Sequence, residues 1–251
     1  MKLMKNYLSL LVALLLMGAT CVMYTSCDDD DAGPVDRSGV DENGREYVDL
    51  GLPTGTLWAA WNVGADSPEE YGDYFAWGET VAKTYYYWST YAWAVPGGGY
   101  YQMTKYCSDA SCGYNGYTDE TKLTELLPED DAATANWGPK WQTPSIAQLE
   151  ELVNPDYTTM EWTTRNGVNG MLVTSKTNNN SIFLPAAGEN YVDISDNPII
   201  YEKGESTYYW ARTLRESGGM FASYLYIYDN DAYTDGGIYR CTGLPVRAVR
   251  K

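Results

Sequence analysis

The stretch FASYLYIY, from Phe221 to Tyr228, alternates tyrosine with smaller side chains over most of its length. Successive side chains of a β-strand point to opposite faces of the sheet, so this pattern predicts a strand with two different faces. We expect Leu225 and Ile227 to lie in the core, on the face that Phe221 and Ser223 share. The opposite face then carries a stripe of tyrosines: Tyr224, Tyr226 and Tyr228.

The segments on both sides of this stretch are also rich in Tyr, Asp, Asn and Arg. Tyrosine suits binding surfaces because its phenol gives a large rigid contact and a hydrogen bond at a low entropy cost. The alternative is that these tyrosines only favour strands and pack beneath aromatic loops. The predicted ligand-binding face, on the C-terminal strands and loops, consists of Trp210, Arg212, Tyr224, Tyr226, Tyr228, Asp229, Asn230, Asp231, Tyr233, Tyr239 and Arg240.

The rest of the chain predicts helices followed by more strands. One helix is expected at residues 128–137 and a second at 144–153, which Thr143 caps and Pro144 opens. Tyr, Trp and Gly are frequent in residues 71–117, which indicates long loops held by aromatic side chains. Since the strands cluster after the helices, we expect an α+β fold, a single domain with antiparallel sheets. Further strands are expected at residues 47–50, 160–164, 171–175, 181–184, 207–214, 238–241 and 246–249. Turns at Asn166-Gly167 and at residues 178–180 predict that the strands from 160 to 184 form an antiparallel meander.

The composition excludes several functions. The 251 residues include 34 Asp and Glu against 17 Lys and Arg, with a formal net charge of −17 and no histidine. Such an acidic chain repels phosphate backbones, so no nucleic-acid partner is expected. A Ser/His triad and His-ligated metals are excluded. Asp229, Asp231 and Asp235 lack the remaining ligands of a calcium loop, so we expect no metal site. Acidic residues are plentiful, but no spacing singles out a catalytic pair, so we expect no enzyme activity and no cofactor.

The N-terminus has the pattern of an export signal. Lys2 and Lys5 precede an apolar run at residues 7–17, which is too short to span a bilayer. We therefore expect residues 1–26 to be a signal peptide.

Cys27, after Thr25 and Ser26, resembles the lipidated cysteine of Bacteroidetes lipoproteins. The four aspartates that follow it are similar to the surface-export signal of the same group. Two acyl chains would anchor the protein in the outer membrane. Residues 27–45 are expected to form an acidic flexible tether, and residues 46–251 the folded domain.

Three other cysteines follow. Cys107 and Cys112 are close enough in sequence to form a disulfide that closes a small loop, which an exported location permits. Cys241 is then left as a buried small hydrophobe or as an exposed reactive thiol.

Several short segments resemble the Fibrobacter succinogenes major paralogous domain, a lipoprotein-associated family. They are spread in order over almost the whole of residues 46–251. Two departures from the family pattern are Ala211-Arg212-Thr213 after Tyr209-Trp210, and Ala248 in place of a proline. The segments that carry the resemblance are Tyr47-Val48-Asp49-Leu50-Gly51-Leu52-Pro53, Gly55-Thr56-Leu57-Trp58, Asn62-Val63-Gly64-Ala65, Ala76-Trp77-Gly78-Glu79, Asp131-Ala132-Ala133, Ala135-Asn136-Trp137-Gly138, Trp141-Gln142-Thr143-Pro144, Gly167-Val168-Asn169-Gly170, Ser181-Ile182-Phe183-Leu184-Pro185-Ala186-Ala187-Gly188, Tyr209-Trp210 and Val246-Arg247-Ala248-Val249.

The resemblance implies a C-type-lectin-like fold of the formylglycine-generating-enzyme type, which presents loops and a terminal strand face to ligands. Some proteins of this fold class are diversified in that segment by retroelements. The implied function is a surface-displayed, adhesin-like module that binds a glycan, a host protein or a neighbouring cell. One alternative is a structural subunit of a fimbrial tip or an outer-membrane complex. The other is a formylglycine-generating-type enzyme, but Cys107 and Cys112 lie too early in the chain for its cysteine pair.

Aromatic side chains also suit sugars, whose apolar ring faces stack on them. Trp77, Trp88, Trp93 and residues 85–87 are candidates for such a platform. Other tryptophans are expected to pin loops to the core: Trp58, Trp137, Trp141, Trp162 and Trp210.

Overall fold

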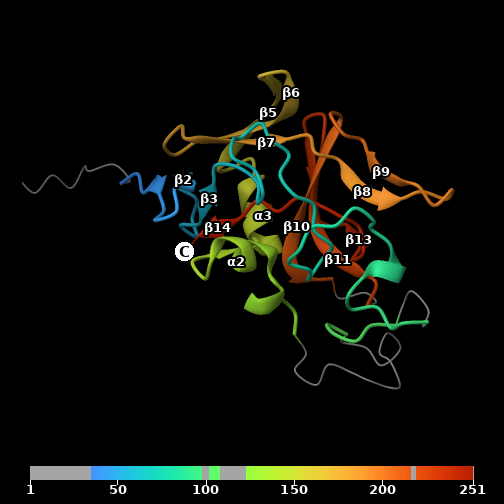
Figure 1. Cartoon of the computed structure of the whole chain (residues 1–251). Helices are drawn as coiled ribbons and strands as arrows, with labels where there is room; N and C mark the ends of the chain where they lie inside the picture. The colour runs from blue at the N-terminus through green and yellow to red at the C-terminus, as the bar shows by residue number, and fades with distance from the viewer. Residues whose placement is uncertain (1–34, 98–101, 108–122, 216–218, 251) are drawn as a thin grey trace, which may run out of the picture. The chain divides into compact units, whose positions relative to one another are not determined.

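The computed structural model describes residues 35–97, 102–107, 123–215 and 219–250. From Asp36 onward the chain forms one compact unit of antiparallel sheets with two short α-helices (Figure 1). Residues 36–45 were expected to be tether, but they are part of this unit. Arg37 Nε lies 2.7 Å from Asp49 Oδ2, and β1 (Gly39–Val40) pairs with β2 (Glu46–Asp49).

One sheet joins the two ends of this unit. Its strand order is β1, β2, β3 (Leu57–Ala59), β14 (Val249–Arg250) and β4 (Trp141–Gln142). Val249 lies opposite Trp58 on one side and Gln142 on the other. The strand near residue 250 is therefore internal to the sheet, although it is shorter than the predicted 246–249.

The predicted first helix is two elements. A 3₁₀ turn, η3 (Pro128–Asp130), is followed by α2 (Ala132–Trp137). Asp131 separates them because its carboxylate caps α2, accepting from the backbone N–H of Ala133 and Thr134. Gly138 ends α2 as predicted.

The second helix, α3 (Ile146–Leu152), is capped by Ser145 and not by Thr143. Ser145 and Gln148 form a reciprocal capping box. Thr143 Oγ1 instead donates to Asp131 Oδ1 at 2.9 Å. Because its hydroxyl bonds to a residue outside α3, Thr143 does not cap this helix.

The predicted meander is confirmed as β5 (Thr158–Arg165), β6 (Val168–Ser175) and β7 (Ser181–Pro185). Asn166 and Gly167 both have positive φ, as a tight hairpin turn between β5 and β6 requires.

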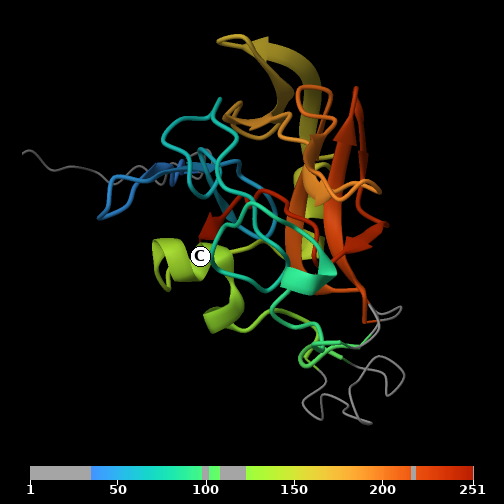
Figure 2. The same cartoon turned by 45° about the vertical axis from the view of Figure 1, so that its right-hand side comes forward.

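The third group of strands contains the stretch FASYLYIY. β11 (Phe221–Tyr228) pairs with β10 (Ser206–Leu214), β12 (Asp231–Tyr233) and β13 (Gly237–Tyr239). β12 was not predicted, nor was the hairpin of β8 (Glu189–Val192) and β9 (Pro198–Tyr201). Figure 2 shows β10 and β11 side by side, with the segment that contains the 3₁₀ turn η1 (Trp88–Thr90) next to them.

Two buried clusters lie on opposite faces of β10 and β11. Tyr209, Leu225 and Ile227 belong to one, and Tyr208 and Trp210 to the other. A third cluster lies beneath the loops and includes Tyr86, Tyr91, Met103, Cys107 and Cys241. Among the described residues, no helix is long and apolar enough to cross a membrane.

Candidate ligand-binding site

The two faces of β11 are partly as predicted. Leu225 and Ile227 are fully buried, whereas Tyr228 is 52% exposed. Tyr224 and Tyr226 are only partly exposed because Tyr208 of β10 packs against both, with ring centroids 5.9 and 4.7 Å away. The tyrosine stripe is therefore well exposed to solvent only at Tyr228, its C-terminal end.

Trp210 and Arg240 were predicted to face a ligand, but both are buried. Trp210 Nε1 donates to the carbonyl oxygen of Phe75 at 2.7 Å. Arg240 lies over the Trp77 ring, 4.9 Å from its centroid, and donates to the carbonyl oxygen of Tyr106 at 2.6 Å. These two side chains are part of the buried core and do not belong to the candidate site.

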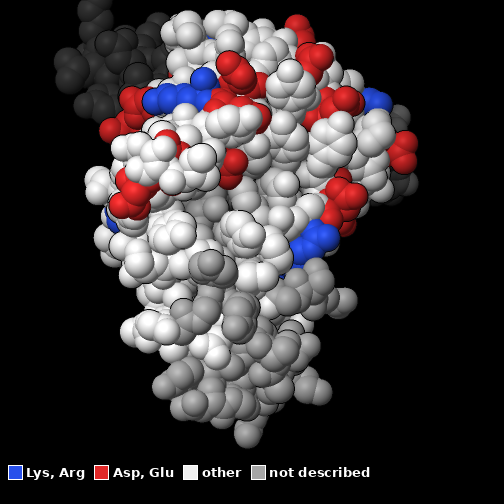
Figure 3. All heavy atoms as spheres, turned by 90° about the vertical axis from the view of Figure 1, so that its right-hand side faces the viewer, with Lys and Arg blue, Asp and Glu red and all other residues white. Residues whose placement is uncertain are grey.

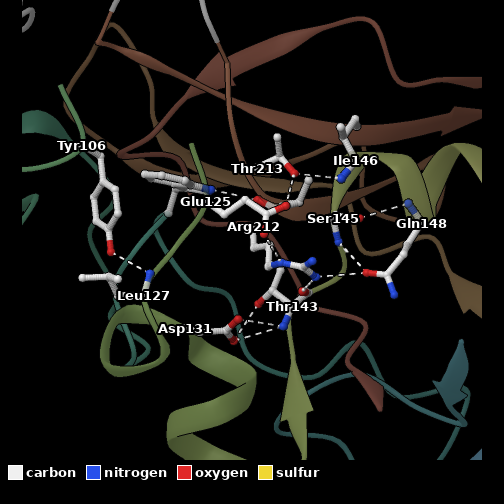
Figure 4. Close-up of polar contacts among 12 residues, drawn as sticks. Tyr106, Glu125, Leu127, Asp131, Thr143, Ser145, Ile146, Gln148, Arg212 and Thr213 are labelled. Atoms are coloured by element: carbon white, nitrogen blue, oxygen red, sulfur yellow. Dashed lines mark hydrogen bonds and ion pairs between the residues drawn. The ribbon is translucent and has the colours of Figure 1, made fainter. Parts of the chain in front are cut away.

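Arg212 is also occupied by contacts within the protein. Its guanidinium donates to Glu125 Oε2 at 2.8 Å, the Thr143 carbonyl at 3.1 Å and Gln148 Oε1 at 3.0 Å (Figure 4). The adjacent Thr213 Oγ1 accepts from the backbone N–H of Ile146 at 3.0 Å. This network ties β10 to α3 and to the segment before η3, which is a structural role.

The remaining predicted residues lie at opposite ends of β11. Tyr239 pairs with Phe221 at its start, whereas Asp231 pairs with Tyr228 at its end. Seven residue steps along a strand separate these ends by roughly 24 Å. The predicted face is therefore two separate surfaces.

The surface at the end of β11 is shallow and exposed. Tyr228 and Asp229 line a depression of about 310 Å³ together with Trp162, Gly204 and Glu205. The Asn230 side-chain oxygen accepts from the Trp162 backbone N–H at 3.1 Å. The other predicted residues of this end, Asp231 and Tyr233, are exposed.

The surface at Tyr239 is hollowed into a cavity of about 440 Å³, which we call the Tyr239 cavity. Its walls come from η1 and the residues before it, from β8, and from β13 and the residues after it. These elements lie on the same side of the molecule (Figure 1). The lining residues are Tyr86, Tyr87, Trp88, Glu189, Tyr191, Val192, Ile238, Tyr239, Cys241 and Thr242.

Contacts between these elements fix the walls of the cavity. Trp88 meets Tyr239 edge to face, and Phe221 stacks on Tyr239 with ring centroids 5.0 Å apart. Asn190 and Gly243 exchange two backbone hydrogen bonds of 2.9 and 2.7 Å, which hold β8 beside the chain after β13. A side chain at Gly243 would clash with the Tyr86 ring, because a Cβ atom there would lie 2.8 Å from it.

Among the described residues that line the Tyr239 cavity, Glu189 is the one with a carboxyl group. No described residue donates a hydrogen bond to its side chain or forms an ion pair with it. Burial, followed by the charge of Glu202, raises the pKa of Glu189 to about 7. Figure 3 faces this side of the molecule and shows Asp and Glu spread more widely over it than Lys and Arg.

The cysteines have different environments. Cys241 is a free thiol, and burial raises its pKa to about 12, so it is not a reactive thiolate. Cys107 is buried and disulfide-bonded. Cys112 and Cys27 lie outside the described residues, so the Cys107–Cys112 pairing and the lipidation stay predictions.

The aromatic residues suggested for sugar binding are divided between the cavity and the core. Tyr86, Tyr87 and Trp88 line the cavity. Trp77 and Trp93 are held elsewhere, since their Nε1 atoms donate to the carbonyl oxygens of Ala211 and Gly78 at 2.8 and 2.9 Å.

The sequence did not indicate Glu189 or Tyr191. Their strand is only four residues long and its alternation is too short to be distinguished from a loop.

Comparison with known proteins finds no matching family model, curated protein or solved structure. Within the described residues, no three Asp, Glu or Cys side chains are grouped so that they can hold a metal ion.

Proposed function

We propose that this protein is a surface-displayed lipoprotein whose Tyr239 cavity binds a ligand. The observation that carries the proposal is the cavity of about 440 Å³ with five aromatic rings in its walls. Concave sites with mostly apolar walls and a few polar groups are typical of small-ligand binding. The resemblance to the Fibrobacter succinogenes major paralogous domain supports the same function, because a lectin-like scaffold presents its terminal strands and loops to ligands.

The cavity modifies the proposed binding face. It uses Tyr239 from the predicted residues and adds Trp88 and Tyr191, whereas Tyr228 and Tyr233 lie at the other end of β11. A ligand group that enters the cavity, such as the end of a glycan chain or a side chain of a host protein, fits this geometry better than a flat protein surface does.

The experiment uses the full-length protein in detergent micelles, screened against glycan and host-matrix arrays. Tyr239→Ala is the test variant and Tyr233→Ala its matched control, because these strand tyrosines are 47% and 48% exposed. We expect Tyr239→Ala alone to lose binding. Equal binding by both variants would show that the ligand does not bind in the Tyr239 cavity.

A structural subunit is the alternative. It predicts a partner protein that co-purifies in stoichiometric amount after gentle detergent extraction, and unchanged co-purification in Tyr239→Ala.

The anchor has its own test. Metabolic labelling with a palmitate analogue should mark the wild-type protein and not Cys27→Ala. Labelling that persists in Cys27→Ala would overturn the lipid attachment at this residue.

A further inference from the structure

We infer that the Tyr239 cavity selects ligands with an organic cation, an ammonium group held between the aromatic rings and facing Glu189. This inference rests on the proposed function and names the chemistry of the ligand.

The first support is the aromatic lining. Ring faces carry partial negative charge and attract an ammonium group within about 6 Å of the ring centroid. The five rings belong to three separate segments of the chain, and those of Trp88 and Tyr239 are inclined by 73° to each other, so the lining is not one flat platform. The lining rings are those of Tyr86, Tyr87, Trp88, Tyr191 and Tyr239.

One of these rings already has a cation against it. Lys83 Nζ lies 5.5 Å from the centroid of Tyr86. Lys83 is not a lining residue, and its charge is taken up by Glu79, whose Oε2 is 2.7 Å from Nζ. The described lining of the cavity therefore contains no lysine or arginine.

The second support is the unpaired carboxyl group of Glu189. Glu202 is the nearby acid, and it is engaged by Ser206 Oγ at 2.7 Å and by the Tyr208 hydroxyl at 3.0 Å. Glu189 has no such donor in the described part of the chain. A partly buried carboxylate without a partner is costly, and a ligand cation would provide the missing partner.

The charge arrangement makes binding depend on pH. The pKa of Glu189 is about 7 in the free protein, and a bound cation favours the carboxylate, so binding releases a proton. The phenols near Glu189 have pKa values raised above the usual value for tyrosine and stay neutral in this range: Tyr191, Tyr201, Tyr208 and Tyr224. Affinity should therefore rise with pH through 7 and fall by up to about tenfold for each pH unit well below it.

The test compares two small molecules of the same shape. Choline has a permanent positive charge, and 3,3-dimethylbutan-1-ol replaces its nitrogen with carbon. Dissociation constants are measured by NMR titration of the full-length protein in micelles at pH 5.5 and pH 8. We expect choline to bind at least tenfold more tightly than the alcohol at pH 8, and to lose most of that preference at pH 5.5.

Glu189→Gln is the test variant, because it removes the charge and keeps the shape. It should weaken choline binding at least tenfold at pH 8 and abolish the pH dependence. Glu205→Gln is the matched control, because it removes one acid from the depression at the other end of β11 and should bind choline as the wild type does.

The inference would be overturned by equal affinity for the charged and neutral molecules, or by unchanged choline binding by a folded Glu189→Gln. Absence of choline binding at millimolar concentration also overturns it. The array screen with Tyr239→Ala decides the proposed function separately, because a neutral glycan lost in that variant would leave a binding module that does not select cations.

Discussion

Trp88 and Tyr239 meet edge to face, with ring centroids 5.7 Å apart. The contact joins η1, in the aromatic loops, to β13, at the edge of the C-terminal sheet. One wall of the Tyr239 cavity therefore exists only when these two distant parts of the chain pack together.

Substitution of either ring should show that the two are coupled. Trp88→Ala and Tyr239→Ala each remove the contact, so the double variant should be less destabilised than the sum of the single variants. We expect a coupling free energy of about 0.5–1.5 kcal/mol, measured by chemical denaturation of all four proteins. Strict additivity would show that the rings do not interact in solution.

Glu189→Gln should stabilise the folded protein at alkaline pH. The pKa of Glu189 rises from 4.5 to about 7 on folding, so the folded state binds more protons between these values. Wild-type stability attributable to this group is fully present below pH 4.5 and is lost as pH rises through 7.

Glu189→Gln has no carboxyl group that can lose a proton at this position, so its stability does not fall for this reason as pH rises. Its advantage over the wild type should appear between pH 4.5 and 7 and reach about 3 kcal/mol above pH 8, measured by urea denaturation. A difference in stability that stays constant from pH 4 to pH 8 would contradict the raised pKa.

Gly188 should be intolerant of alanine. It has a φ of +65°, and a Cβ atom there would lie 2.1 Å from the Tyr201 carbonyl oxygen. Gly188→Ala should lower the free energy of unfolding by about 3 kcal/mol and displace β8, which would also remove choline binding.

Gly204 is the matched control for Gly188. It has a φ of +85°, and nothing lies within 4 Å of a Cβ atom built there. Gly204→Ala should cost only about 1 kcal/mol, since it has the same backbone strain without the clash. Equal losses in the two variants would mean that strain alone limits Gly188.

Arg247 should not be replaceable by lysine. Its buried guanidinium donates to Asn62 Oδ1 at 2.9 Å and to the carbonyl oxygens of Ala59 and Phe183 at 3.1 and 2.7 Å. An ammonium group cannot reach all three acceptors, so Arg247→Lys should cost about 2–4 kcal/mol in urea denaturation.

Arg37→Lys is the control for Arg247. Arg37 pairs with Asp49, but its side chain is 50% exposed, so the loss should stay below about 1 kcal/mol. Similar losses in both variants would argue against a special role for the buried guanidinium.

Local patterns in the sequence predicted much of the fold. The alternation in FASYLYIY predicted β11 and the burial of Leu225 and Ile227. Asn166-Gly167 predicted the turn between β5 and β6. These features depend on residues close together in the chain. The prediction that Thr143 caps α3 was wrong because Thr143 bonds to Asp131, twelve residues away.

The candidate site was less predictable because it depends on contacts between distant segments. Tyr239 and the residues around Trp88 were proposed for binding, but as two separate surfaces. No local pattern indicates that Glu189 lies between them without a partner. Likewise, the burial of Trp210 and Arg240 follows from packing against Phe75 and Trp77, which are far away in the sequence.

The position of β14 has a consequence for the order of folding. Val249 lies between β3 and β4, so β3 pairs only with β2, and β4 has no partner in this sheet, until the residues near 250 have been synthesised. The sheet that joins both ends of the compact unit can form β1, β2 and β3 from the N-terminus, but it cannot take up β4 before β14 is present. A nascent chain that ends before this point leaves one edge of β3 and both edges of β4 unpaired, so this sheet is completed only after synthesis has passed residue 249.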